Sequence, residues 1–148
     1  MKQLIIVVLL IVFVSCTSGS LTRIKFNPVR GGVKCHLLIP KNYELERISG
    51  HGNRFSYTYQ DSSMIYISTF NNTPNYDNLR SQGTYYTKWF AQKSDSSLVL
   101  SGEDSLGLYW KDITEGVLSI GYMNVSKQQK ALFDSALNSL KYEKYKPK

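Results

Sequence analysis

The sequence predicts an α+β fold: a mostly antiparallel sheet of about six strands, with a middle helix and a C-terminal amphipathic helix packed on it. Short runs of alternating apolar and polar residues, separated by turn residues, predict the strands. Two longer segments with helical spacing interrupt them, and no regular alternation of strand and helix indicates a parallel sheet. A chain of 148 residues, 42% of them apolar, is sufficient for one domain, expected over residues 33–141.

The chain begins with the three parts of an export signal. Lys2 precedes an apolar run from Leu4 to Val14, and the small residue Ser15 follows. As a helix, such a run would reach about 16 Å, roughly half the thickness of a hydrocarbon core, so it is too short to span a bilayer stably. Residues 1–15 are therefore predicted to be a secretory signal peptide that is removed.

The end of this segment, Phe13-Val14-Ser15-Cys16, resembles the lipobox of bacterial lipoproteins, except that Phe13 stands where Leu is usual. The resemblance implies that Cys16 becomes the first mature residue and carries acyl chains that anchor it in a bilayer. Cleavage nearby without lipidation, which would give a soluble secreted protein, is the alternative. Neither an acidic cluster nor an Asp follows Cys16, which favours the periplasmic face of the outer membrane.

Residues 16–32 start with small and polar side chains and are predicted to form a lipidated tether. Residues 142–148 form a basic tail that includes Lys144 and Lys146. Loss of the single charge of Lys2 takes the net charge from +7 to +6 in the mature chain. The tail is a candidate contact for anionic groups, with a solvated, frayed end as the alternative. Nucleic acid is not an expected partner for an exported protein.

Seven runs have the composition and alternation of strands, and each ends at turn residues. Pro40 ends the first of them, because proline cannot donate to a sheet. In that run Cys35 alternates with polar neighbours, which predicts a buried thiol, although an odd cysteine could also pair between molecules. The predicted strands are residues 33–39, 44–48, 54–60, 64–70, 98–101, 105–113 and 117–125.

Two helices are predicted. In the first, over residues 76–92, Leu79, Tyr86 and Phe90 recur at helical spacing despite Gly83. The second follows Ser126-Lys127-Gln128-Gln129, which matches a capping box. Its apolar stripe predicts that it packs on the sheet, and consists of Leu132, Phe133, Ala136, Leu137 and Leu140.

Residues 33–140 resemble the PsbP-like α+β domains. The resemblance lies in Leu37-Leu38-Ile39-Pro40-Lys41-Asn42-Tyr43, in the tyrosine-rich hairpin that follows, and in the closing Phe133-Asp134-Ser135-Ala136-Leu137-Asn138-Ser139-Leu140-Lys141. It implies a fold used as a non-catalytic accessory or binding module in large membrane assemblies, and it carries over no active-site residues.

The residues needed for catalysis are sparse. The two histidines, His36 and His51, have no nucleophile signature nearby, and no cofactor-binding motif or clustered metal ligands are present. Four acidic residues lie in or beside predicted turns, where their spacing in the fold is not evident: Glu103, Asp104, Asp112 and Glu115. We therefore expect no catalytic residues, no cofactor and no metal, with a small hydrolase that uses paired carboxylates as an alternative.

The remaining signal is aromatic. Tyr85 and Trp89 point about 100° away from Tyr86 and Phe90 on a helix, so the two pairs cannot share one face. We expect one pair to look outward and take Tyr85 and Trp89 as candidate contact residues.

The expected function is that of a lipoprotein anchored to the bilayer through acylated Cys16, acting as a binding or accessory subunit of an envelope complex with a protein partner. A periplasmic immunity protein or enzyme inhibitor is the alternative, and the sequence does not identify a small-molecule ligand.

Overall fold

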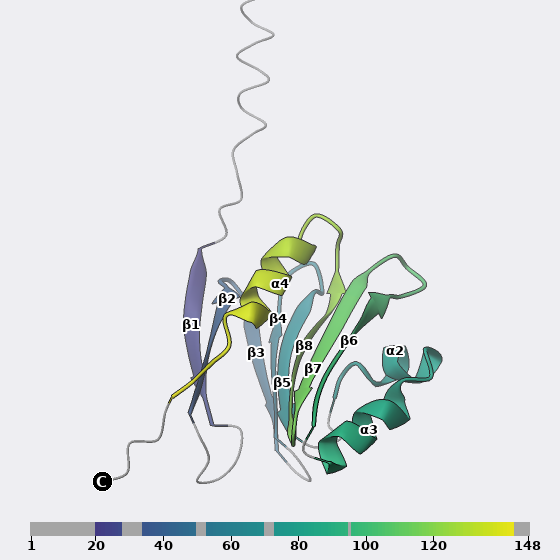
Figure 1. The fold of residues 1–148 in the computed structure, drawn as a ribbon. Helices are drawn as coiled ribbons and strands as arrows, with labels where there is room; N and C mark the ends of the chain where they lie inside the picture. Colours follow the sequence, from purple (N-terminus) through teal and green to yellow (C-terminus); the bar gives the residue numbers. More distant parts are fainter. Residues whose placement is uncertain (1–19, 28–33, 50–52, 70–72, 95, 144–148) are drawn as a thin grey trace, which may run out of the picture.

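The computed structural model describes residues 20–27, 34–49, 53–69, 73–94 and 96–143. Within these ranges the chain forms nine strands and three helices, and the predicted α+β class is confirmed. The strands make two antiparallel sheets, one of six strands and one of three. Figure 1 shows the larger sheet between two layers of other elements.

The six-stranded sheet has the order β3-β4-β5-β8-β7-β6, so neighbours in the chain are mostly neighbours in the sheet. Hairpins join β3 to β4, β4 to β5, β6 to β7 and β7 to β8, as expected where short turns separate alternating runs. The strands are β3 (Glu44–Ile48), β4 (Arg54–Thr58), β5 (Met64–Thr69), β6 (Ser97–Glu103), β7 (Tyr109–Glu115) and β8 (Leu118–Val125).

The small sheet corrects two predicted boundaries. Its central strand β2 (Cys35–Pro40) pairs with β1 (Leu21–Phe26) on one side and with the short β9 (Lys141–Tyr142) on the other. The prediction of a tether over residues 16–32 is therefore wrong for β1, and the tail over residues 142–148 starts too early. The signal was present in β1, because Ile24 and Phe26 are buried while Arg23 and Lys25 between and beside them are exposed.

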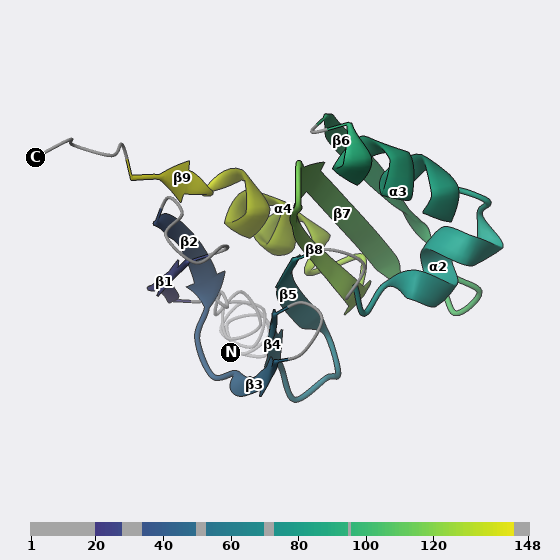
Figure 2. The same ribbon diagram turned by 90° about the horizontal axis from the view of Figure 1, so that it is seen from below.

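The two faces of the six-stranded sheet are covered differently. The small sheet and α4 (Lys130–Asn138) cover one face, and α2 (Tyr76–Ser81) with α3 (Tyr85–Lys93) covers the β6–β7 part of the other. Figure 2 shows α4 and α3 on opposite sides of β7 and β8. The C-terminal helix thus packs on the sheet as predicted, through Phe133, Ala136 and Leu137.

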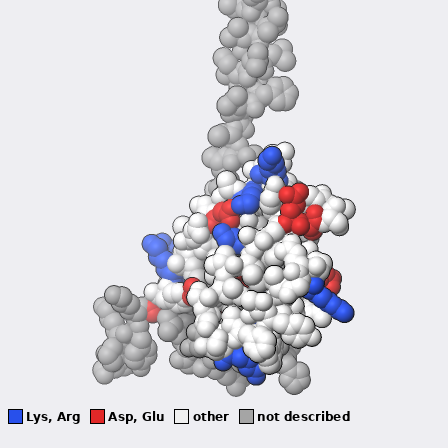
Figure 3. Space-filling view, turned by 45° about the vertical axis from the view of Figure 1, so that its right-hand side comes forward, with Lys and Arg blue, Asp and Glu red and all other residues white. Residues whose placement is uncertain are grey.

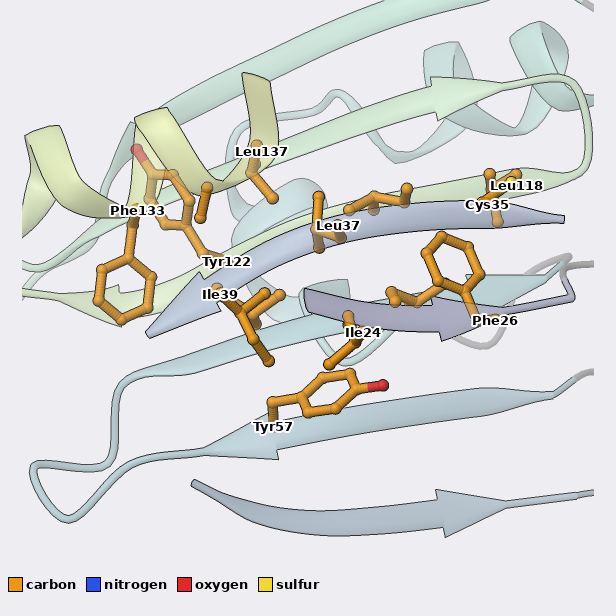
Figure 4. Packing of buried hydrophobic residues seen from close by; sticks show 14 of the residues in the cluster. Ile24, Phe26, Cys35, Leu37, Ile39, Tyr57, Leu118, Tyr122, Phe133 and Leu137 are labelled. Carbon is orange, nitrogen blue, oxygen red and sulfur yellow. The ribbon is translucent and has the colours of Figure 1, made fainter. Parts of the chain in front are cut away.

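The main apolar core lies between the small sheet, α4 and the large sheet (Figure 4). Cys35 is fully buried there, which confirms the predicted buried thiol. Burial, and then the charge of Glu115, raises the pKa of this thiol to about 11. Because the neutral thiol dominates at physiological pH, Cys35 behaves as a small apolar residue.

The helices differ from the prediction at their ends. The single helix expected over residues 76–92 is two helices, because Gly83 takes a φ of 69° between them. The capping box also fails: the Ser126 hydroxyl donates to Gln129 Oε1 at 2.8 Å, and α4 begins only at Lys130. No helix among the described residues is long and apolar enough to cross a bilayer.

Candidate functional site

The outer side of α2 and α3 carries a group of aromatic residues that we call the aromatic face: Tyr76, Tyr85, Tyr86, Trp89 and Phe90. Tyr86 and Phe90 are 71% and 62% exposed, whereas Tyr85 and Trp89 are half-buried. An aromatic pair does look outward, but it is the opposite pair to the one that the sequence suggested. Exposed aromatic side chains in such number are typical of protein contacts.

The rings of the aromatic face are held against one another edge to face. The ring centroids of Tyr76 and Tyr85 are 4.8 Å apart, those of Tyr85 and Tyr86 are 5.6 Å apart, and those of Trp89 and Phe90 are 5.1 Å apart. Such pairs restrict the side chains before any partner binds, which lowers the entropic cost of association. In Figure 3, which turns this side of the molecule forward, the surface over α2 and α3 is mostly uncharged.

A buried ion pair fixes α3 on the sheet beneath the aromatic face. Lys88 points inward and its Nζ lies 2.5 Å from Asp112 Oδ2 on β7, with side chains only 2% and 1% exposed. Burial lowers the pKa of the Lys88 ammonium, and the charge and hydrogen bond of Asp112 oppose that shift. Because a buried charge without its partner is very unfavourable, this pair sets the rotation of α3 about its axis.

Asp112 has further partners on its own strand and on β5. The Tyr66 hydroxyl donates to its Oδ2 at 2.6 Å, and the Thr114 hydroxyl donates to its Oδ1 at 3.0 Å. Tyr66 lies on β5 and reaches β7 across Gly121 of β8, where a side chain would collide with its hydroxyl. Burial, and then the charge of Asp112, raises the pKa of Tyr66 well above its usual range, so the hydroxyl remains a donor.

Sequence reasoning missed this network and, with it, the face that α3 buries. The apolar spacing of Leu79, Tyr86 and Phe90 indicated a buried stripe, but in α3 the buried residues are Lys88 and Ala91. No apolar residue lies three or four positions from Ala91, where a helix that packs through an apolar stripe would have one. This gap on the Ala91 face is the only signal in the sequence that could have indicated a buried lysine. The partner Asp112 was singled out as a turn carboxylate, and it lies instead inside β7.

The other acidic candidates are not brought together. Glu103 and Asp104 lie at the β6–β7 hairpin, whereas Glu115 is at the far end of β7 and accepts a hydrogen bond from Tyr142. Three hollows among the described residues have none of the four carboxylates in their linings. Among the described residues no group of three potential metal ligands occurs.

The remaining candidate residues are the two histidines and three residues near the ends of the chain. His36 Nε2 lies 2.6 Å from Glu143 Oε1, in a hydrogen bond that connects β2 to the segment after β9. His51, Cys16, Lys144 and Lys146 lie outside the described residues. Their expected roles therefore stay predictions.

Comparison with family models, with curated proteins and with solved structures finds no match to this chain, so the resemblance to PsbP-like domains also stays a prediction.

Proposed function

We propose that the protein is a lipid-anchored, non-catalytic binding module of a bacterial envelope complex and that the aromatic face docks its protein partner. The observation that carries the proposal is the outward position of Tyr86 and Phe90 on a helix whose orientation is fixed by a buried ion pair. Tyrosine and phenylalanine are enriched at protein interfaces, and contacts of this kind dominate binding energy when they are held rigidly.

The position of the predicted anchor agrees with such a role. The Ser20 carbonyl accepts a hydrogen bond from the Lys41 amide at 3.2 Å, so the small sheet begins four residues after Cys16. Four residues span at most about 14 Å, which would keep the starting end of β1 close to the bilayer surface. In Figure 1, α2 and α3 lie toward the other end of the domain, where a partner could reach the aromatic face.

Anchoring would also strengthen the interaction without new contacts. A module confined to a membrane meets partners in the same membrane at a raised effective concentration, so a modest docking surface is sufficient for a stable complex. The bilayer, through acylated Cys16, and an envelope protein are then the two partners. No nucleic acid is involved.

The anchor and the docking surface are tested separately. Incorporation of labelled palmitate by cells that express the full chain, but not by cells that express Cys16→Ala, is expected if the anchor is present. Recovery of the wild-type protein in the medium with an unmodified thiol at Cys16 would contradict it.

For the docking surface, a photo-crosslinking residue at Phe90 should capture a defined partner in the native host. The same residue at Val99, which is 56% exposed on β6, is the matched control. The double variant Tyr86→Ser and Phe90→Ser should lose co-purification of that partner from detergent extract, whereas Val99→Ser should keep it. Equal recovery with all variants would refute the docking role of the aromatic face. Capture of an incoming toxin or hydrolase instead of a resident subunit would identify an immunity protein or inhibitor.

A further inference from the structure

A hollow of about 430 Å³ lies where the end of β1 meets β3 and β4, between the two sheets. Three basic side chains from separate segments surround it: Lys25 of β1, Lys34 just before β2, and Arg47 of β3. All three residues are exposed to solvent. The hollow is within the size range of small-molecule sites.

The wall of this hollow is aromatic. Phe55 and Tyr57 of β4 line it from the large sheet, and Phe26 of β1 lines it from the small sheet. Figure 4 shows Tyr57 between its strand and β1, and Phe26 near the end of β1. Arg47 is the cross-strand partner of Phe55, and its guanidinium carbon lies 5.7 Å from the Phe55 ring centroid. This cation–π contact orients the guanidinium toward the hollow before a ligand binds.

The three positive charges lack compensation. Among the described residues no carboxylate lines the hollow, and Lys25, Lys34 and Arg47 form no ion pair there. Two other hollows have different linings. One is also lined by basic residues, Arg23, His36 and Lys141, but His36 contacts Glu143 and no Phe or Tyr lines it, whereas the other is lined by Asp61.

A neutral donor completes the set. Tyr57 is only 4% exposed, and its hydroxyl makes no hydrogen bond to another described residue, unlike those of Tyr59 and Tyr66. Burial, and then the proximity of Tyr43, raises its pKa to about 12, although the nearby Arg47 acts in the opposite direction. The hydroxyl therefore keeps its proton at physiological pH and is able to donate to an anion.

We propose that this hollow binds the phosphate group of a small, soluble phosphate ester whose organic part packs against the aromatic wall. Two lysines and one arginine match the double negative charge and the several acceptor oxygens of a phosphomonoester better than the single charge of a carboxylate. The anion site itself does not depend on the anchor or on the aromatic face, because the hollow shares no residue with either. Only the choice of a soluble ester over a lipid headgroup rests on the proposed anchor at Cys16.

A soluble ester is favoured over a lipid headgroup by the position of the hollow. β1 runs from Leu21, near the predicted anchor, to Phe26 at the hollow, and six residues of strand cover about 20 Å. The hollow therefore opens at the end of the domain away from the anchoring bilayer. Headgroup phosphates of that membrane are too distant to enter it.

The test uses the full chain purified in detergent and three probes: phenyl phosphate, inorganic phosphate and benzoate. Calorimetry should give saturable binding of phenyl phosphate with a dissociation constant below about 1 mM, and weaker binding of the other two probes. Arg47→Gln or Lys34→Gln should each weaken phenyl phosphate binding about tenfold, and Arg47→Lys should restore part of the loss. Tyr57→Phe should weaken it by a smaller factor, because the ring remains.

Lys127→Gln is the matched control, since it removes one exposed charge at the β8–α4 connection, far from the hollow. Equal weakening by Lys127→Gln would mean that net charge alone attracts the probe and would overturn the site. Absence of saturable binding, or benzoate binding as tightly as phenyl phosphate, would also overturn it. A fourth arm uses vesicles with anionic phospholipid: binding to them that is lost in Arg47→Gln, with no binding of the soluble ester, would refute the soluble ligand in favour of a headgroup.

Discussion

Replacement of Lys88 by Met should strongly destabilise the domain, because it removes one member of a buried ion pair and leaves the other. Met has nearly the length of Lys, so the change creates little empty space and isolates the loss of charge. Asp112, 1% exposed, would keep its hydrogen bonds from Tyr66 and Thr114 but would lose the cation 2.5 Å away. Breaking a buried pair in this way costs about 3–5 kcal/mol.

The retained hydroxyl donors place the expected value for Lys88→Met near the lower end of that range. A loss of about 3 kcal/mol corresponds to a decrease in Tm of roughly 12 °C for a domain of this size. Urea unfolding, followed by the fluorescence of Trp110, which is buried on β7, measures the free energy directly. The double variant with Asp112→Asn should be more stable than Lys88→Met alone by at least about 1 kcal/mol, because the isolated charge is gone.

A second-site change distinguishes loss of the charge pair from ordinary loss of packing. Asp112→Asn should recover stability in the Lys88→Met background, because it removes the isolated charge. It should recover none in the background of Leu79→Ala, a truncation of a fully buried residue on α2 that should cost about 2–5 kcal/mol. A Lys88→Met protein within about 0.5 kcal/mol of wild type would refute the reasoning, as would a double variant no more stable than Lys88→Met.

Three further predictions use the same unfolding assay or amide exchange. Gly121→Ala should cost about 2–3 kcal/mol, because its methyl group would meet the Tyr66 hydroxyl and displace it. Gly83→Ala is the control and should cost about 1 kcal/mol, because Gly83 has a positive φ. A smaller loss of stability in Gly121→Ala than in Gly83→Ala would contradict the prediction. Burial acts to raise the pKa of Asp134, but hydrogen bonds from two lysines and a tyrosine outweigh it and lower the pKa below 3.8. The folded state therefore binds fewer protons there, stability is full above pH 3.8 and falls as the pH drops below it, and Asp134→Asn should flatten that decline. The Ser139 hydroxyl accepts a hydrogen bond from the Leu38 amide of β2 at 2.7 Å. Ser139→Ala should therefore cost about 1–2 kcal/mol and speed hydrogen exchange of that amide, and unchanged exchange would argue against the bond.

Much of the fold could be predicted because its signals are local. Alternation of apolar and polar residues located the strands of the large sheet to within a few residues, and the stripe on the last helix placed α4 against it. The strand β1 was not predicted, because the small polar residues before it are typical of a tether. Its own signal, the alternation of Ile24 and Phe26 with basic neighbours, covers only a few residues.

The candidate site was harder to predict, because the ion pair that orients α3 joins Lys88 to Asp112, which is distant in sequence. Hydrophobic periodicity assumes that the apolar side of a helix is the buried one, and α3 reverses this by burying Lys88 and exposing Phe90. A single sequence does not reveal that Asp112 on β7 makes this reversal favourable. The basic hollow is equally dispersed, since Lys25, Lys34 and Arg47 meet only after both sheets have formed.

The strand β2 has as its two neighbours the first and the last strands of the described chain (Figure 2). The Glu143 amide also donates to the Lys34 carbonyl at 2.7 Å, so the segment just after β9 closes against the start of β2. A polypeptide synthesised from its N-terminus therefore cannot complete this small sheet until residues 141–143 have been made, after every other described element. The sheet that contains the earliest strand of the described fold is thus the last part of that fold to close.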